Sequence, residues 1–201
     1  MMRSAEASKE RILEAALAEF SAHGIAGARV DRIAHAARCN KNLIYIYFED
    51  KETLFTTVLF KHLTRIHEEQ PFTPDDLPGF AGKVFDWAMA NPDLMRLMAW
   101  SALEQKAKGQ AERLAAFEGK ITALTEAQNA GAVGTAFPPD FLLIAVMSLA
   151  TAWSVAGLFG SSVNPKADKR LAAQRKSLIE AVRLLANAGK RTRNRGRSLS
   201  R

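Results

Sequence analysis

Hydrophobic residues recur at three- and four-residue steps along most of the 201-residue chain, which is the spacing of amphipathic helices. No clear alternation of apolar and polar residues indicates a strand. Helix start and stop signals divide the pattern into nine segments. These are Lys9–His23, Arg29–Ala37, Lys41–Phe48, a fourth helix capped by Asp50 with apolar positions as far as Ile66, and then 77–90, 92–106, 110–129, 139–160 and 165–188. The pattern therefore predicts an all-α fold of about nine helices.

Several residues mark the predicted helix ends. Gly24, Gly131 and Gly189 stand where helices should end, often with a left-handed residue. Asn40 is suited to cap the third helix, because its side chain can accept a hydrogen bond from an early backbone N–H. The Pro-rich stretch 70–78 interrupts the helical pattern and is the best candidate for a boundary within the chain.

Charge is concentrated at one end of the chain. The formal net charge is +7, and the tail 190–201 supplies six of these charges without an acid, so the remainder is close to neutral. A uniformly basic coat for nucleic acid is therefore excluded, and any contact with DNA must come from a local arrangement of charges. The tail has almost no apolar residues, and we expect it to be disordered.

Other features of the composition indicate a cytoplasmic protein. Cys39 is the only cysteine, which rules out an internal disulfide and fits a reducing compartment. The N-terminal region has charges among its apolar positions, so we do not expect a signal peptide. Residues 141–160 carry no charge and are long enough for a membrane span. They include Ser148, Thr151 and Ser154, and we favour a helix buried on all sides, as in a dimer interface, over membrane insertion.

The second and third predicted helices are short and joined by a tight turn, which is a helix-turn-helix pattern. Such a pair places its second helix in the major groove of DNA. At 100° per residue, Ile44 and Phe48 face the core, while Asn42 and Ile46 point the opposite way. The predicted groove face consists of Lys41, Asn42, Leu43, Tyr45, Ile46 and, at its edge, Tyr47.

The residue types on this face suggest different roles in binding DNA. Asn42 can pair with a base edge, whereas Leu43 and Ile46 can offer only apolar contact, for example to thymine methyl groups. Phosphate contacts, which fix the register, are expected from Lys41, Tyr45, Tyr47 and Lys51. Arg29, in the first turn of the second helix, is a further candidate for a phosphate or base contact.

The local sequence adds a more specific signal. The run from Arg11 to Phe55 closely resembles the DNA-binding domain of the TetR family of regulators. The matching positions are Ile12, Ala15, Ala16, Phe20, Gly24, Val30, Ile33, Ala34, Ala37, Tyr45, Tyr47, Phe48, Lys51, Glu52 and Leu54. With this resemblance we divide the chain into a DNA-binding domain (1–50), a ligand-binding and dimerisation domain (51–189) and a basic tail (190–201).

This sequence departs from the family pattern at several positions. Arg38 stands where the family usually has glycine, and a left-handed backbone there costs about 1 kcal/mol more without glycine. Ala28 and Arg29 replace the usual Thr or Ser at the start of the second helix, which removes a cap and a phosphate contact. Leu43 and Ile46 replace residues that are commonly polar. These differences bear on the operator sequence and on affinity rather than on the fold.

Large, soft side chains are frequent between residues 80 and 153. For any one of them a place in the core is the simpler interpretation. The resemblance implies that some of them line a cavity for a mostly apolar ligand. The candidates are Phe85, Met89, Met98, Trp100, Phe117, Met147 and Trp153. The helices at 139–160 and 165–188 are expected to form a two-fold dimer interface.

Three other classes of protein compete with a regulator. An enzyme is disfavoured, because the four histidines are scattered and neither a Gly-rich phosphate loop nor a nucleophile motif is present. We accordingly expect no metal and no cofactor. A helical ligand-binding or interaction protein that no longer reads DNA stays open, and a membrane-anchored regulator depends on residues 141–160. The resemblance implies a cytoplasmic, ligand-responsive homodimer that binds a palindromic operator, usually as a repressor.

Overall fold

The computed structural model describes residues 2–104, 110–157 and 170–190. Within these ranges it has nine α-helices and no strand. They are α1 (Met2–Gly27), α2 (Val30–Ala36), α3 (Lys41–Phe48), α4 (Lys51–Glu69), α5 (Leu77–Ala90), α6 (Pro92–Glu104), α7 (Gln110–Asn129), α8 (Pro139–Thr151) and α10 (Leu171–Asn187), with a 3-10 turn η1 (Pro74–Asp76) before α5. This confirms the all-α prediction.

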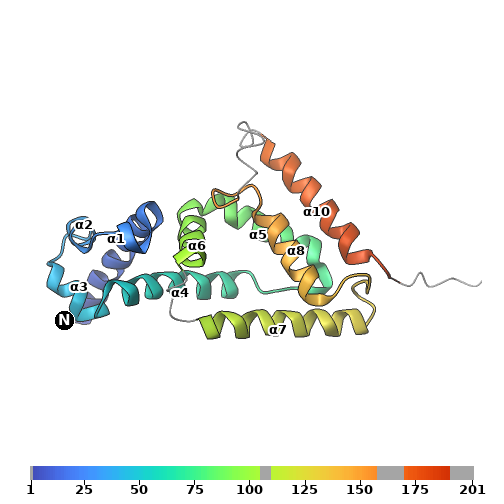
Figure 1. Ribbon diagram of the computed structural model, residues 1–201, viewed down its shortest axis with the longest axis horizontal. Coiled ribbons are helices and arrows are strands. Elements are labelled where there is room, and N and C mark those ends of the chain that lie inside the picture. The colour runs from blue at the N-terminus through green and yellow to red at the C-terminus, as the bar shows by residue number, and fades with distance from the viewer. Residues whose placement is uncertain (1, 105–109, 158–169, 191–201) are drawn as a thin grey trace, which may run out of the picture.

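The helices are arranged along an elongated molecule (Figure 1). Helices α1, α2 and α3 gather at one end, α4 runs from them through the middle, and α10 lies at the opposite end. Two apolar cores correspond to the two ends. The first core joins α1–α4 with α6 and includes Phe20, Ile33 and Phe55, and the second joins α5, α7, α8 and α10 and includes Phe85 and Leu142. The division of the chain at residue 50 stays a prediction.

Helix α1 is longer than the sequence pattern predicts. It begins at Met2 rather than Lys9, because the residues before Lys9 contain neither glycine nor proline to interrupt it. The helix kinks at Gly24 (φ 65°, ψ −177°), a conformation that favours glycine, and one further turn follows to Gly27. The predicted end at His23 therefore marks the kink instead of the last helical residue.

One helix was predicted over 139–160, and its start at Pro139 is confirmed but its continuation beyond Thr151 is wrong. Helix α8 ends at Thr151, and residues 152–157 form successive turns. The chain folds back so closely that a Cβ on Gly157 would lie 2.1 Å from the Ala152 carbonyl oxygen, which only glycine allows. None of the helices in the described part of the chain is long and apolar enough to cross a membrane.

Other predicted boundaries agree to within one residue or lie outside the described residues. Helix α2 is one residue shorter at each end than the predicted Arg29–Ala37, and α10 ends at Asn187 rather than at 188. Helices α3, α5 and α7 have the predicted bounds, and Gly131 and Gly189 have positive φ angles of 75° and 77°. The predicted start of the last helix at residue 165, and the last two residues predicted for the helix 92–106, lie outside the described ranges. The tail 191–201, expected to be disordered, also lies outside them.

Candidate nucleic-acid interface

Helix α3 is held by a cap at its start and by two buried side chains. The Asn40 side chain accepts a hydrogen bond from the Asn42 backbone N–H at 2.9 Å, which confirms the predicted cap. Ile44 and Phe48 are each 2% exposed, as the helical period predicts. The Lys9 ammonium lies 5.9 Å from the centre of the Phe48 ring and ties α1 to the end of α3. The helix is therefore fixed on one face only.

The opposite face of α3 is open to solvent. Ile46 is 73% exposed and Tyr45 is 42% exposed, and Asn42 is also exposed. Leu43 and Tyr47 are partly buried and pack against the first core. Ile46 therefore gains little from burial in the monomer, and together with Tyr45 it gives this face exposed apolar and aromatic surface.

The turn between α2 and α3 has the left-handed residue that the sequence predicts. Arg38 has φ 52°. On either side of it, the Cys39 N–H donates to the Ala34 carbonyl oxygen (3.0 Å), and Arg11 Nε donates to the Ala37 carbonyl oxygen (3.3 Å). Burial raises the pKa of the Cys39 thiol more than the nearby Arg11 charge lowers it, which favours the protonated thiol at neutral pH.

A second left-handed residue, which the sequence analysis missed, ends α3. Glu49 has φ 63° and ψ −60°, and the Asp50 N–H donates to the Phe48 carbonyl oxygen across it at 2.6 Å. This is a tight γ-turn, a strained conformation for a residue other than glycine. Asp50 then caps α4 by accepting the Thr53 N–H at 2.6 Å. A turn at both ends sets the direction of α3.

A hollow of about 480 Å³ lies beside α3 and brings four of the predicted DNA-binding residues together. It is lined by Ala28, Arg29, Val30, Asp31, Lys41, Tyr45, Asp50 and Lys51. Lys41 forms an ion pair with Asp31 at 2.9 Å, and this bond raises the pKa of Lys41. Lys51 Nζ donates to the Ala28 carbonyl oxygen at 3.2 Å. Both lysines are therefore engaged within the protein, whereas the Arg29 side chain is exposed.

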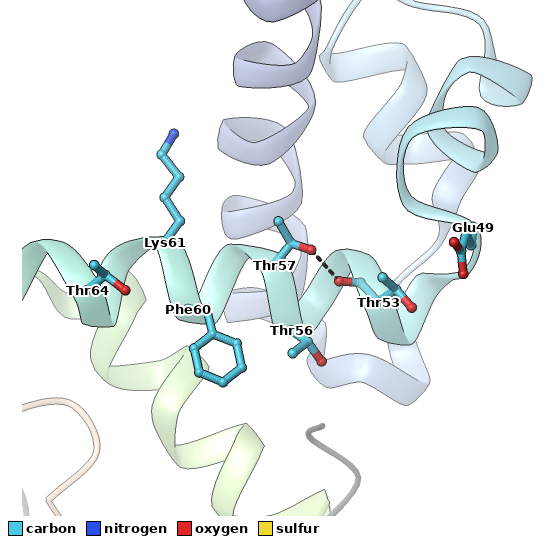
Figure 2. A pocket seen from close by; sticks show the side chains of 7 residues that line it. All are labelled: Glu49, Thr53, Thr56, Thr57, Phe60, Lys61 and Thr64. Carbon is cyan, nitrogen blue, oxygen red and sulfur yellow. Dashed lines mark hydrogen bonds between the residues drawn. The ribbon is translucent and has the colours of Figure 1, made fainter. Parts of the chain in front are cut away.

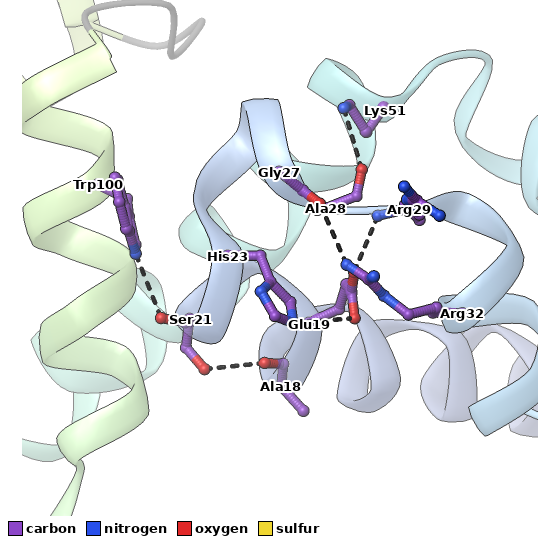
Figure 3. Close-up of polar contacts among 10 residues, drawn as sticks. All are labelled: Ala18, Glu19, Ser21, His23, Gly27, Ala28, Arg29, Arg32, Lys51 and Trp100. Atoms are coloured by element: carbon purple, nitrogen blue, oxygen red, sulfur yellow. Dashed lines mark hydrogen bonds and ion pairs between the residues drawn. The ribbon is translucent and has the colours of Figure 1, made fainter.

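Glu19 of α1 is a polar residue of this region that the sequence analysis did not identify. Its Oε1 atom accepts hydrogen bonds from the Arg29 backbone N–H and from Arg32 Nε, each at 2.8 Å (Figure 3). Arg29 is the N-cap of α2 and its side chain makes no capping bond, as predicted from the missing Thr or Ser. Glu19, from another helix, instead binds the backbone N–H of the N-cap residue itself, which is a different bond from the one that a capping Thr or Ser would make.

The Glu19 carboxylate is held in its charged form. The side chain is 11% exposed. Burial raises its pKa, but the hydrogen bonds from Arg32 and from the Arg29 N–H, together with the Arg32 charge, lower the pKa of Glu19 below its ordinary value. His23 Nε2 lies 3.9 Å from the other carboxylate oxygen.

The predicted ligand-pocket residues fall into three places. Phe85, Met89, Met147 and Trp153 belong to the second core, where the Phe85 and Trp153 rings lie 6.3 Å apart. Met98 packs against the first core, and the Trp100 indole N–H donates to the Ser21 carbonyl oxygen at 3.2 Å. Phe117 is 43% exposed on α7. The structure thus brings four of the seven side chains into one cluster.

A separate pocket of about 500 Å³ lies along α4 (Figure 2). It is lined by Glu49, Thr53, Thr56, Thr57, Phe60, Lys61 and Thr64, none of which was predicted. The Thr56 and Thr57 hydroxyls donate to carbonyl oxygens one turn earlier in the helix, at 2.9 and 2.7 Å, and Lys61 forms an ion pair with Glu10. Its polar groups are largely satisfied by the protein.

Comparisons with known proteins cover both ends of the molecule. Residues 12–58 match the family model for bacterial regulatory proteins of the tetR family, and residues 76–183 match that for the tetracyclin repressor-like C-terminal domain. The chain is 41% identical over 156 residues to the HTH-type transcriptional repressor SCO4008 of Streptomyces coelicolor, which covers 76% of this chain and 81% of the relative.

Solved structures with the same fold include regulators from other bacteria. The transcriptional regulator SCO4942 from Streptomyces coelicolor superposes with a TM-score of 0.77 at 38% identity, covering 87% of this chain and 96% of that chain. FadR from Bacillus subtilis, in complex with stearoyl-CoA, has a TM-score of 0.64 at 19% identity, covering 89% of this chain and 97% of that chain. At that identity the second likeness shows the fold alone.

Proposed function

Because the chain belongs to the TetR family of bacterial transcriptional regulators, we propose that it binds a palindromic operator as a homodimer and represses the genes that the operator controls. Binding of a mostly apolar ligand releases the protein from the operator. The observation that carries this proposal is the exposed face of α3 beside a hollow lined by Arg29, Lys41, Tyr45 and Lys51. A cytoplasmic location and the absence of catalytic activity follow from the proposal.

In this proposal α3 enters the major groove of the operator. Asn42 hydrogen-bonds a base edge, and Ile46 and Leu43 contact thymine methyl groups. The phosphate contacts come from Arg29, Lys41, Tyr45, Tyr47 and Lys51. Since Lys41 pairs with Asp31 in the free protein, a phosphate must compete with this carboxylate for the ammonium group.

The dimer is proposed to form through α8 and α10. Phe141, Ile144 and Leu184 are between 52% and 62% exposed on these helices, and the Phe137 ring stacks on Phe141 with centres 5.4 Å apart. Exposed apolar residues of this size on two helices favour a self-complementary interface. A two-fold axis there would place the two α3 helices about 34 Å apart, one turn of DNA.

The ligand is proposed to bind at the second core, among Phe85, Met89, Met147 and Trp153. Methionine and aromatic side chains adapt to apolar ligands of various shapes. For Met98, Trp100 and Phe117 the structure suggests other roles, in packing α6 against α1 and on the surface of α7.

The test is selection of duplexes from a random DNA library by the full-length protein. We expect a palindrome whose half-sites are one helical turn apart. Asn42→Ala combined with Ile46→Ala should lose most of the affinity for the selected duplex without unfolding the protein, because both side chains are exposed. If a folded dimer selects no duplex, the alternative of a helical sensor that no longer reads DNA is correct.

A further inference from the structure

We propose that Glu19 and Arg32 are positioning residues for DNA binding, which hold the start of α2 in place without touching DNA themselves. This inference rests on the proposed operator binding. Neither residue belongs to the exposed face of α3, and neither lines the hollow beside it.

The contacts converge on the last residue of α1 and the two residues that connect it to α2, which together we term the 27–29 link. The Gly27 carbonyl oxygen accepts from Arg32 Nη2 at 3.1 Å, the Ala28 carbonyl oxygen accepts from Lys51, and the Arg29 N–H donates to Glu19. Each of the three residues in the link is thus held by a charged side chain, and these side chains come from α1, α2 and α4 (Figure 3).

This arrangement matters because regular structure ends within the link. Gly27 is the last residue of α1, and the Ala28 N–H still donates to the Gly24 carbonyl oxygen at 3.2 Å, but Arg29 lies outside both helices. Arg29 has an extended backbone (φ −118°, ψ 123°) and no capping bond from its own side chain. The following helix has only seven residues, too few to be stable by itself. Glu19 and Arg32 therefore determine where Arg29 projects from the wall of the hollow relative to α3.

The pair also affects specificity through charge. Arg32 is 44% exposed near the DNA-facing side, and its ion pair with Glu19 offsets a positive charge that would otherwise attract any phosphate backbone. Glu19→Ala would have two effects at once: Arg29 would lose its position, and Arg32 would lose the carboxylate with which it pairs. The expected result is weaker binding to the operator and equal or stronger binding to unrelated DNA.

Three substitutions separate these effects. Glu19→Gln keeps an acceptor for the Arg29 N–H and removes the charge, so it should rescue part of the loss. Arg32→Lys can pair with Glu19 but lacks the second nitrogen that reaches Gly27. Glu14→Gln is the matched control, since Glu14 is an exposed residue of the same helix and the charge change is the same.

The experiment measures fluorescence anisotropy of the selected duplex and of a scrambled duplex with each full-length variant at several salt concentrations. Hydrogen exchange of the amides in residues 27–33 is followed in the free protein, and thermal melting checks the fold. We expect Glu19→Ala to lower the ratio of specific to non-specific affinity about tenfold, comparable to losing one base contact. Exchange in residues 27–33 should accelerate, with Glu19→Gln intermediate and Glu14→Gln unchanged.

Unchanged affinities and exchange in folded Glu19→Ala would overturn the proposal, and so would equal effects from Glu14→Gln. If Glu19→Ala does not fold, Glu19→Gln and Arg32→Lys decide the matter by the same two measurements. If the wild-type protein prefers no duplex, the proposed function fails, and accelerated exchange in Glu19→Ala still supports the positioning of the link.

Discussion

Arg38 and Glu49 hold left-handed backbone conformations at the two ends of α3, with φ angles of 52° and 63°. In this region the Cβ atom of any residue other than glycine crowds the backbone. At Arg38 the turn is supported by the bond from Arg11 to the Ala37 carbonyl oxygen, and at Glu49 by the γ-turn bond across it. The direction of α3 therefore depends on two strained residues and on the contacts that hold them.

Replacing the strained arginine with glycine should stabilise the protein. We expect Arg38→Gly to raise the free energy of unfolding by about 0.5–1 kcal/mol, because relief of the backbone strain exceeds the entropy that glycine adds to the unfolded chain. Urea denaturation measures this difference. Arg38→Ala removes the same charge and keeps the strain, so equal stability of the two variants would show that the backbone is not the cause.

The lowered pKa of Glu19 leads to a prediction of how the stability of the protein depends on pH. Because its pKa in the folded protein lies below the ordinary value, the ionised carboxylate stabilises the fold at neutral pH. This stabilisation is complete above about pH 4.3, the ordinary pKa of glutamate, and is lost as the pH falls from there through the lower pKa of Glu19 in the folded protein. The stability difference between wild type and Glu19→Gln should shrink over this range. A constant difference would show that folding does not lower the pKa of Glu19.

At the scale of elements, the sequence predicted those helices whose ends have local signals. Asn40 and Asp50 cap the helices that follow them, and the period of the apolar residues identified the buried and exposed faces of α3. The end of α8 was missed because the absence of charge persists beyond Thr151, while the close approach of Gly157 to Ala152 is a tertiary feature. Glu19 was missed for the same reason, since its partners lie ten or more residues away.

The exposed apolar residues of α8 and α10 lead to a prediction about assembly. Ile144→Asp should convert the proposed dimer into a monomer, because it would bury a charge without a partner at the two-fold interface. By symmetry the interface would contain this charge twice, once from each protomer. Sedimentation equilibrium measures the change. Thr122→Asp adds the same charge on the exposed side of α7 and should leave the dimer intact. Dimers in both variants would exclude α8 from the interface.

At the scale of the whole molecule, α6 links the two cores. Its Leu94 and Leu97 side chains are buried in the first core, while α5, one residue earlier in the chain, belongs to the second. The Asn91 side chain donates to the Trp87 carbonyl oxygen at 2.8 Å and closes the end of α5. A displacement in the second core can therefore reach the first through this short connection.

The contact between Trp100 and Ser21 is where such a displacement would reach α1. The indole N–H donates to the Ser21 carbonyl oxygen two residues after Glu19, so the same stretch of α1 contacts α6 on one side and the 27–29 link on the other (Figure 3). Trp100→Phe keeps an aromatic ring and removes the donor. We expect it to cost about 1 kcal/mol of stability.

This substitution should also accelerate hydrogen exchange of the amides in residues 21–29, because α6 would hold the end of α1 less firmly. Trp153→Phe is the matched control, since Trp153 packs in the second core. If both variants accelerate exchange at residues 21–29 equally, the effect is general destabilisation and Trp100 is not a specific link. If only Trp100→Phe does so, the bond from Trp100 to Ser21 connects α6 to the residues that position Arg29.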